Sequence, residues 1–273
     1  KRQAEANLIW SLRKAGLSLM TGRKGDAKPA TGIEDAAVRP KDLPQYVAAL
    51  QSLMATLGLQ ASYYGHAAAG LLHVRPILNL HSAEDLKKFR QLANDVSALV
   101  ACFKGSLAGE HGVGIARSEF MAEQLDEGLL GVMREIKGSF DPHNLFNPGK
   151  VIPDGRYKMD TELRQGVDRE LKLPFTPVLA FAAKDGSFTR NLEQCNGCGG
   201  CRKETPTMCP TFIATGEEIM STRGRANAIR AALELRGVAG GDPLRCAELE
   251  AALSNCLSCK ACTTECPSNV NLA

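Results

Sequence analysis

The 273-residue sequence has little of what marks membrane-spanning or nucleic-acid-binding proteins. No apolar run approaches the ~20 residues that a membrane-spanning helix needs, and no signal-peptide core follows Lys1. Aromatic residues are only 5% of the chain, few for a surface that stacks on bases. Neither charge is in excess, because 33 lysines and arginines against 30 aspartates and glutamates leave a net charge of +3. We therefore predict that the protein neither spans a membrane nor binds nucleic acid.

Cysteine, by contrast, is abundant. The chain has ten cysteines, and 44% of its residues are apolar, which is enough for folded cores. At roughly 150 residues per domain, the length predicts about two domains.

Eight of the cysteines form two blocks near the C-terminal end. The first block holds Cys195, Cys198, Cys201 and, before Pro210, Cys209; the second holds Cys256, Cys259, Cys262 and, before Pro267, Cys266. The spacing is typical of the C-x2-C-x2-C-x3-C-P run of [4Fe-4S] proteins, in which the fourth cysteine ligates the other cluster. Nothing indicates secretion, so a disulfide framework is disfavoured, while structural zinc stays the alternative.

The crossed arrangement predicts the ligands of two [4Fe-4S] clusters. One cluster takes Cys195, Cys198, Cys201 and Cys266, and the other takes Cys256, Cys259, Cys262 and Cys209. Seven residues separate Cys201 from Cys209, whereas the C-x2-C-x2-C-x3-C-P run has three at this point. Cys209 therefore departs from the pattern more than the other seven ligands. Cys102 and Cys246 lie in apolar helical patterns, and we expect both to be small buried side chains.

Between the blocks the pattern is helical. Ala226–Leu235 is rich in helix formers, the glycine-rich stretch 237–241 interrupts it, and Asp242-Pro243 is expected to open a second helix. A helical ferredoxin-type domain is therefore favoured over a small βαβ ferredoxin. Arg223 and Arg225 are either counter-charges to the clusters or ordinary solvated arginines.

The first 150 residues mix helical and strand patterns. Apolar residues recur at helical spacing over 4–20, 44–57, 86–100 and up to about Phe140, whereas 59–64 and 71–80 are short and apolar enough for strands. Ser82, followed by Glu84 and Asp85, predicts a helix N-cap. The order predicts an α+β fold with helices on one face of a sheet.

Three of the five histidines lie in two glycine-rich segments. His66 and His73 bracket an Ala/Gly turn, and Glu110-His111 stands between Gly109 and Gly112. Two histidines and a carboxylate can hold a divalent metal and leave positions open for substrate, whereas a histidine on an apolar strand is more often a core residue. The residues alone leave both interpretations open. For His81 and His143 we expect no special role.

Four segments together resemble the C-terminal cap domain, or substrate domain, of flavin-linked 2-hydroxy-acid dehydrogenases, a family that includes D-lactate, glycolate and D-2-hydroxyglutarate dehydrogenases. These segments are 10–13, 65–73, 109–112 and 141–150. The stretch 221–227 between the cysteine blocks resembles large bacterial (YdiJ-like) fusions of this oxidase to an iron–sulfur module. The resemblance implies a substrate domain over 1–152, a linker over 153–190, and a small all-α domain with two [4Fe-4S] clusters over 191–273.

The resemblance also implies roles for particular residues. It makes His66, His73 and Glu110 ligands of a divalent metal (Zn, Fe or Mn), His111 the general base, Arg13 the partner of a substrate carboxylate, and Asn147 a neighbour of the flavin. Arg75 stands where hydroxyglutarate enzymes have asparagine, and it is either a second carboxylate-binding charge or a residue that faces solvent. Lys28 is one candidate for the family's substrate lysine.

The implied reaction oxidises a D-2-hydroxy acid to the 2-oxo acid and passes electrons from FAD through the clusters to a quinone or a redox protein. We expect a cytoplasmic protein, either free or peripheral at a membrane. The sequence has no glycine-rich flavin diphosphate fingerprint, so we expect FAD to be held mostly by a missing N-terminal domain and the chain to be inactive alone. The alternatives are a non-catalytic iron–sulfur subunit that docks on a separate flavoprotein, and a zinc-stabilised interaction module.

Overall fold

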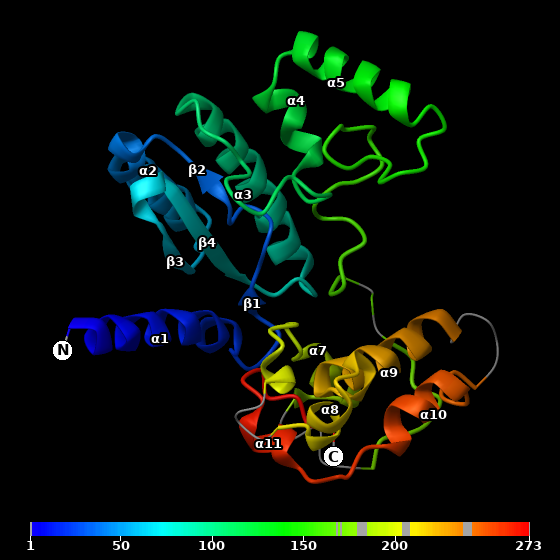
Figure 1. The fold of residues 1–273 in the computed structure, drawn as a ribbon. Helices are drawn as coiled ribbons and strands as arrows, with labels where there is room; N and C mark the ends of the chain where they lie inside the picture. The colour runs from blue at the N-terminus through cyan, green and yellow to red at the C-terminus, as the bar shows by residue number, and fades with distance from the viewer. Residues whose placement is uncertain are drawn as a thin grey trace. The chain divides into compact units, whose positions relative to one another are not determined.

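The computed structural model describes residues 2–167, 169, 171–178, 185–203, 208–236 and 242–272 (Figure 1). The chain divides into two compact units. The sheet unit is Pro29–Val167, and the helical unit combines Lys1–Lys28 with Asp168–Ala273. No helix among the described residues has the length and apolar character to cross a membrane.

A small antiparallel sheet organises the sheet unit. β3 (Ala61–His66) and β4 (Leu71–Leu78) form a hairpin through a single 3-10 turn over Ala67–Ala69. β4 is the central strand, since β1 (Lys28–Pro29) and β2 (Ala36–Ala37) also pair with it. In the hairpin register, Tyr64 lies opposite His73.

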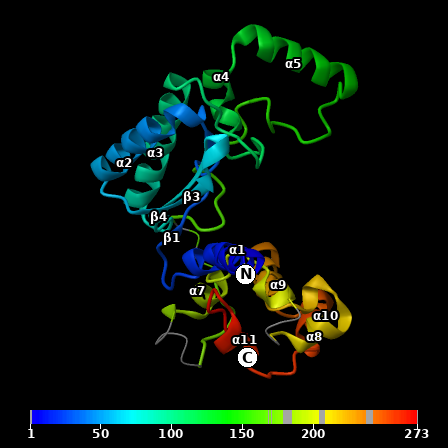
Figure 2. The ribbon, with the colours of Figure 1, turned by 60° about the vertical axis from the view of Figure 1, so that its left-hand side comes forward.

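The two faces of this sheet differ in chemistry because strand side chains alternate between them. On one face, Val74 and Leu78 enter the core. α2 (Leu43–Thr56) and α3 (Ala83–Cys102) cover this face, as both ribbon views show (Figures 1 and 2). The core residues from these helices are Tyr46, Leu50, Met54, Phe89, Leu92, Ala93, Val96 and Val100. The opposite face, called the histidine face below, carries Ser62, Tyr64, His66, Leu71, His73 and Arg75.

Most predicted elements of the sheet unit are confirmed. The α+β class is correct, and Ser82 caps α3 by accepting a hydrogen bond from the Asp85 N–H at 3.4 Å. α4 (Met121–Gln124) and α5 (Glu127–Phe140) follow. The prediction for Cys102 is wrong: it is the last residue of α3 and its side chain is exposed, because the helix has turned that position away from the core.

The start of the range predicted as a linker packs on the sheet unit. Met159 is buried in the core, and its N–H donates to Glu119 at 2.7 Å. Arg90 forms ion pairs with Glu119, at 2.9 Å, and with Asp160. The domain boundaries drawn from the sequence stay a prediction.

The described part of residues 168–273 forms only helices and turns. The helices are α7 (Phe188–Glu193), α8 (Pro210–Thr215), α9 (Thr222–Arg236), α10 (Ala247–Ser254) and α11 (Ala261–Glu265). α1 (Arg2–Thr21) belongs to the same unit. Buried Leu192, Ala226, Leu233 and Leu249 form its core. The helical character agrees with the sequence prediction.

One helix begins later than expected. α10 starts at Ala247, not at Asp242, because the Asp242 carboxylate accepts the Leu244 N–H at 3.1 Å and closes an isolated turn. Cys246 immediately precedes α10 and is half-buried against the core. The glycine-rich stretch 237–241 lies outside the described residues.

Candidate functional site

Two histidines come from the β3–β4 hairpin. His73 lies in the middle of β4 with only 3% of its side chain exposed, and His66 ends β3. The hairpin turn needs glycine at position 70, where φ is +69° and a Cβ would lie 1.8 Å from the Val38 carbonyl oxygen. Gly70, in the turn that the two histidines bracket, thus lets them share one face.

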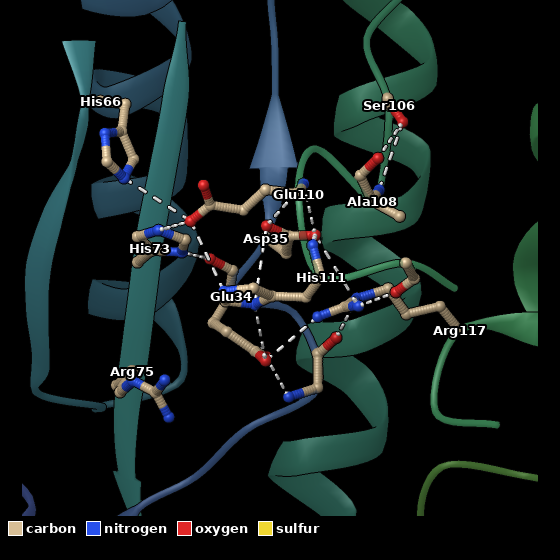
Figure 3. A network of polar contacts seen from close by, with 12 residues as sticks. Glu34, Asp35, His66, His73, Arg75, Ser106, Ala108, Glu110, His111 and Arg117 are labelled. Carbon is tan, nitrogen blue, oxygen red and sulfur yellow. Dashed lines mark hydrogen bonds and ion pairs between the residues drawn. The ribbon is translucent and has the colours of Figure 1, made fainter. Parts of the chain in front are cut away.

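A glycine-rich loop after α3 supplies Glu110 and His111. The loop is tied to Asp35, the residue before β2, because the Gly109 N–H donates to the Asp35 carbonyl oxygen at 2.8 Å. A Cβ on Gly109 would lie 2.5 Å from Leu71 Cδ1, so glycine permits this close approach. The loop places Glu110 over the histidine face (Figure 3).

The Glu110 carboxylate is the centre of the site. Its Oε1 lies 2.8 Å from Nε2 of His73 and 3.5 Å from Nε2 of His111. Nε2 of His66 is 3.6 Å from the same oxygen. The structure therefore brings together four residues that the sequence analysis singled out: His66, His73, Glu110 and His111, called the Glu110 cluster below.

A hydrogen bond defines which nitrogen of His73 carries a proton. His73 Nδ1 lies 3.0 Å from the backbone carbonyl oxygen of Glu34, which can only accept, so Nδ1 donates. In a neutral ring, Nε2 then directs a lone pair at the Glu110 carboxylate. Two lone pairs at 2.8 Å repel unless a proton or a metal cation lies between them. A ligand histidine whose other nitrogen is fixed by a backbone carbonyl is common at metal sites.

A buried polar network supports the cluster from beneath. Asp35 is fully buried, and its carboxylate accepts the N–H groups of Glu110, at 3.1 Å, and of His111, at 2.9 Å. Arg117 donates to the carbonyl oxygens of Gly32, at 2.9 Å, and Gly112, at 2.7 Å. Its Nη2 lies 3.1 Å from Oε1 of Glu34.

Sequence reasoning missed Glu34, Asp35 and Arg117. The available signal was the adjacent acids between Ile33 and Ala36, because acids in an apolar stretch are seldom buried without partners. With neutral imidazoles, the carboxylates of Glu34, Asp35 and Glu110 outnumber the Arg117 cation. The site is therefore electronegative and suits a cation.

The donor atoms could hold a divalent metal. Asp35, His73, Glu110 and His111 each offer an atom within 4.8 Å of the others. Ligand atoms about 2.0–2.2 Å from a tetrahedral metal lie about 3.3–3.6 Å apart, close to the spacing around Glu110 Oε1. Imidazole and carboxylate together suit zinc, iron or manganese.

Other predicted site residues have separate surroundings. Arg13 is exposed on α1 of the helical unit, with its guanidinium 6.0 Å from the centre of the Trp10 ring. Lys28, in the same unit, donates to Gln194 at 2.6 Å, and burial lowers its pKa. Asn147 is exposed in the loop after α5 and accepts from Lys150 at 3.2 Å. Their assigned roles stay predictions, and His143 is exposed in a turn.

Arg75 extends the histidine face. It lies two residues beyond His73 on β4, and its Nε donates to the Tyr64 hydroxyl at 2.8 Å. The Tyr64 ring packs against the His73 ring, with 4.8 Å between ring centres. Arg75 forms no ion pair with any carboxylate among the described residues, so its charge is available on the same face as the Glu110 cluster.

In the helical unit, four cysteines line one cavity. They are Cys209, Cys256, Cys259 and Cys262, the set that the crossed rule assigns to one cluster. Cys209 lies in the left-handed region with φ of +60° at the start of α8, so the chain turns sharply to present its Sγ.

The remaining four cysteines are also neighbours. Burial raises the pKa of the Cys266 thiol, and the nearby thiols of Cys195 and Cys198 add to the increase. The Gly200 N–H donates to Cys198 Sγ at 3.5 Å, and the Arg223 N–H donates to Cys201 Sγ at 3.4 Å. Backbone donors to sulfur are typical of cluster ligands.

Comparison with known proteins gives two family matches. Residues 1–151 match the family described as "FAD linked oxidases, C-terminal domain", and residues 191–270 match the "4Fe-4S dicluster domain". These matches support FAD and iron–sulfur clusters as cofactors and disfavour the zinc alternative for the cysteine blocks.

Several curated relatives align with nearly the whole chain. The chain is 33% identical to a D-2-hydroxyglutarate dehydrogenase of Escherichia coli, 31% to one of Pantoea ananatis and 32% to one of Pseudomonas putida. Each alignment covers 97% of this chain but only 29% of the relative. The chain thus spans less than a third of the length of these relatives.

Proposed function

The chain belongs to the FAD-linked oxidases, whose C-terminal domain occupies residues 1–151, and from this we propose that it forms the substrate-binding and electron-relay portion of a D-2-hydroxy-acid dehydrogenase. The observation that carries the proposal is the Glu110 cluster, in which three imidazoles surround one carboxylate oxygen. A protein that only relayed electrons would have no use for this arrangement.

We assign different chemical roles to the residues of the Glu110 cluster. We assign His66, His73 and Glu110 as ligands of a divalent metal, which when bound would lower the pKa of a substrate hydroxyl. His111 is more exposed than His73, and its Nε2 lies beside the same carboxylate oxygen, so it can receive the hydroxyl proton. The buried Asp35 carboxylate, 3.7 Å from His111 Nδ1, stabilises the imidazolium that results.

The electrons leave the substrate with the hydrogen on C2. FAD, held mostly by a domain outside this chain, supplies the two-electron acceptor, and Asn147 and Arg13 are the residues we assign to the flavin and to a substrate carboxylate. Loss of the hydroxyl proton to His111 and of the C2 hydride leaves the 2-oxo acid. The eight block cysteines hold the clusters that carry single electrons onward.

The substrate we favour is a dicarboxylate. The relatives cited above are named for D-2-hydroxyglutarate. Residues two apart on a strand are about 6.6 Å apart, so Arg75 can meet a distal carboxylate while the hydroxyl end lies at the Glu110 cluster. The acceptor that we propose is a quinone or a redox protein, and the thiol-rich cluster blocks suit the reducing cytoplasm.

Replacement of His111 tests the proposal. In the natural full-length polypeptide that carries this sequence, His111→Ala should lower the rate constant of flavin reduction by about 10²–10⁴-fold if His111 is the base. The measurement is flavin reduction by D-2-hydroxyglutarate and by D-lactate in a stopped-flow spectrophotometer. His143→Ala, which removes an exposed histidine from a turn, is the matched control and should leave the rate unchanged.

Two outcomes would contradict the proposal. A near-normal rate in His111→Ala would remove His111 from the mechanism. Failure of every 2-hydroxy acid to reduce the flavin of the unaltered protein would favour the alternative of an iron–sulfur subunit without its own catalysis.

A further inference from the structure

Two arginines at the start of α9 face the two sets of cysteines in different ways. Arg223 belongs to the set around Cys201, to whose sulfur it donates its N–H. Its guanidinium is paired with Glu218, through Nε at 2.7 Å and Nη2 at 3.0 Å. Arg202 also binds Glu218, at 2.9 Å. Glu218 and Arg202 are about half exposed, so solvent screens this group of charges.

Arg225 is buried and has no such partner. Its Nε donates to the Ala252 carbonyl oxygen at 2.7 Å, its Nη1 to Cys209 Sγ at 3.3 Å, and its Nη2 lies 4.0 Å from Met220 Sδ. Only 4% of the residue is exposed. Among the described residues no carboxylate pairs with it, although a buried cation is costly without a counter-charge.

The cavity beside Arg225 supplies a reason for the missing partner. Arg225 lines it together with Cys209, Cys256, Cys259 and Cys262. Four thiolates around an iron–sulfur core carry a net negative charge, which increases by one when the cluster is reduced. Lys260, an exposed residue, also lines the cavity, and its positive charge adds to that of Arg225.

We propose that Arg225 makes the cluster of Cys209, Cys256, Cys259 and Cys262 the higher-potential cluster of the two, so that the first electron delivered to the pair resides there. A buried positive charge stabilises the more negative, reduced state, and its effect is large where water does not screen it. The N–H donated to Cys209 Sγ acts in the same direction. At the other set, Glu218 offsets the charge of Arg223.

The inference rests on the two-cluster assignment and not on the dehydrogenase activity, so the two can fail separately. The test is a redox titration of the anaerobically purified full-length polypeptide, followed by electron paramagnetic resonance at low temperature. Two one-electron midpoints are expected. Arg225→Met should lower the higher midpoint by at least the equivalent of tenfold in equilibrium constant, about 59 mV for one electron, and leave the lower midpoint in place.

Two further variants complete the design. Arg225→Lys keeps the charge and should produce a smaller shift of the same midpoint. Glu218→Gln removes the carboxylate beside Arg223, is at an exposed position, and should raise the lower midpoint without moving the higher one. If Arg225→Met does not bind iron, these two variants decide the question.

The proposal is overturned if iron-loaded Arg225 variants keep both midpoints, or if they move only the lower one. It is also overturned if Glu218→Gln shifts the higher midpoint, because the carboxylate would then act on the cluster assigned to Cys209.

Discussion

Asp35 acts on the Glu110 cluster without occupying its open side. By accepting the consecutive N–H groups of Glu110 and His111, its carboxylate fixes the peptide that joins them. The two side chains therefore meet the hairpin histidines in a defined geometry. Since Asp35 is fully buried and its charged carboxylate is the acceptor in each of these bonds, its loss would free the loop that carries His111.

Arg75 provides a prediction about substrate choice. In Arg75→Met the distal carboxylate of a dicarboxylate would lose a charge-assisted hydrogen bond worth about 1.5–3 kcal/mol. We expect KM for D-2-hydroxyglutarate to rise about 10–100-fold, while KM for D-lactate, which has no distal carboxylate, stays within about twofold. Steady-state kinetics with both substrates on the full-length protein measure this.

Arg134→Met is the matched control for Arg75→Met. Arg134 pairs with Glu127 on exposed α5, far along the chain from the histidine face, and its loss should leave both KM values unchanged. If Arg75→Met raised KM equally for the two substrates, Arg75 would support the sheet instead of binding the distal carboxylate.

At the residue level the sequence predicted the Glu110 cluster but not the buried residues that hold it in place. Glycine-rich contexts identified His66, His73, Glu110 and His111, because a tight backbone and a polar side chain together are unusual. Asp35 escaped notice since its partners lie 75 and 76 positions later, a separation that only the fold closes. The prediction that Cys102 is buried was wrong because an apolar pattern does not show where the end of a helix leaves the core.

Among the elements, the end of α5 depends on one carboxylate. Asp141 accepts a hydrogen bond from Lys137 and the N–H groups of Leu145 and Phe146, both at 2.9 Å. The Lys137 ammonium, with these backbone donors, lowers the pKa of Asp141 to about 2. The carboxylate thus closes the loop that leads to Asn147.

This pKa predicts how the stability of the α5 end depends on pH. Because the folded-state pKa is depressed, the contribution of Asp141 is fully present above its unfolded value of 3.8 and is lost as pH falls through about 2. The difference in free energy of unfolding between wild type and Asp141→Asn should therefore be constant from pH 7 to 5 and shrink between pH 4 and 2. Urea unfolding, followed by circular dichroism at each pH, measures it.

The control for Asp141→Asn is Asp95→Asn, whose carboxylate accepts from the exposed Gln91 amide on α3. It should change the free energy of unfolding little. A difference between wild type and Asp141→Asn that stays constant down to pH 2 would contradict the role assigned to the Asp141 charge.

The elements that could be predicted are those with a long periodic pattern. α2, α3 and the β3–β4 hairpin each follow from regular apolar spacing and a clear turn or cap. β1 and β2 have two residues each and exist because β4 pairs with them, so no local pattern marks them. The start of α10 was misplaced because Asp242 closes a turn with the same side chain that would cap a helix.

At the scale of the molecule, the two chemistries occupy different units. The Glu110 cluster belongs entirely to the sheet unit and the eight block cysteines to the helical unit. The fold class, the Glu110 cluster and the two cysteine blocks could be predicted from motifs. Which segments make up the helical unit could not be predicted, because nothing in residues 1–28 indicates that they pack with residues some 140 positions later.

Metal content tests the cluster assignment directly. The full-length polypeptide, purified without oxygen, should be brown and contain about eight iron and eight sulfide per chain if both cysteine sets hold [4Fe-4S] clusters. Cys209→Ala should lower the iron content by up to half, whereas Cys102→Ala, at an exposed site outside both blocks, should leave it unchanged. Colourless protein with stoichiometric zinc in the cysteine blocks would contradict the cluster assignment.

The helical unit combines residues 1–28 with residues 168–273, two segments that the sheet unit separates in the sequence. Gly22 accepts from Asn269 at 3.2 Å, Asp26 pairs with Arg190 at 3.4 Å, and Lys28 donates to Gln194. A ribosome that adds 5–20 residues per second needs roughly 8–35 s to travel from Lys28 to Gln194. During synthesis the sheet unit can therefore fold first, while the segment around Gly22 waits for partners that have not yet been translated.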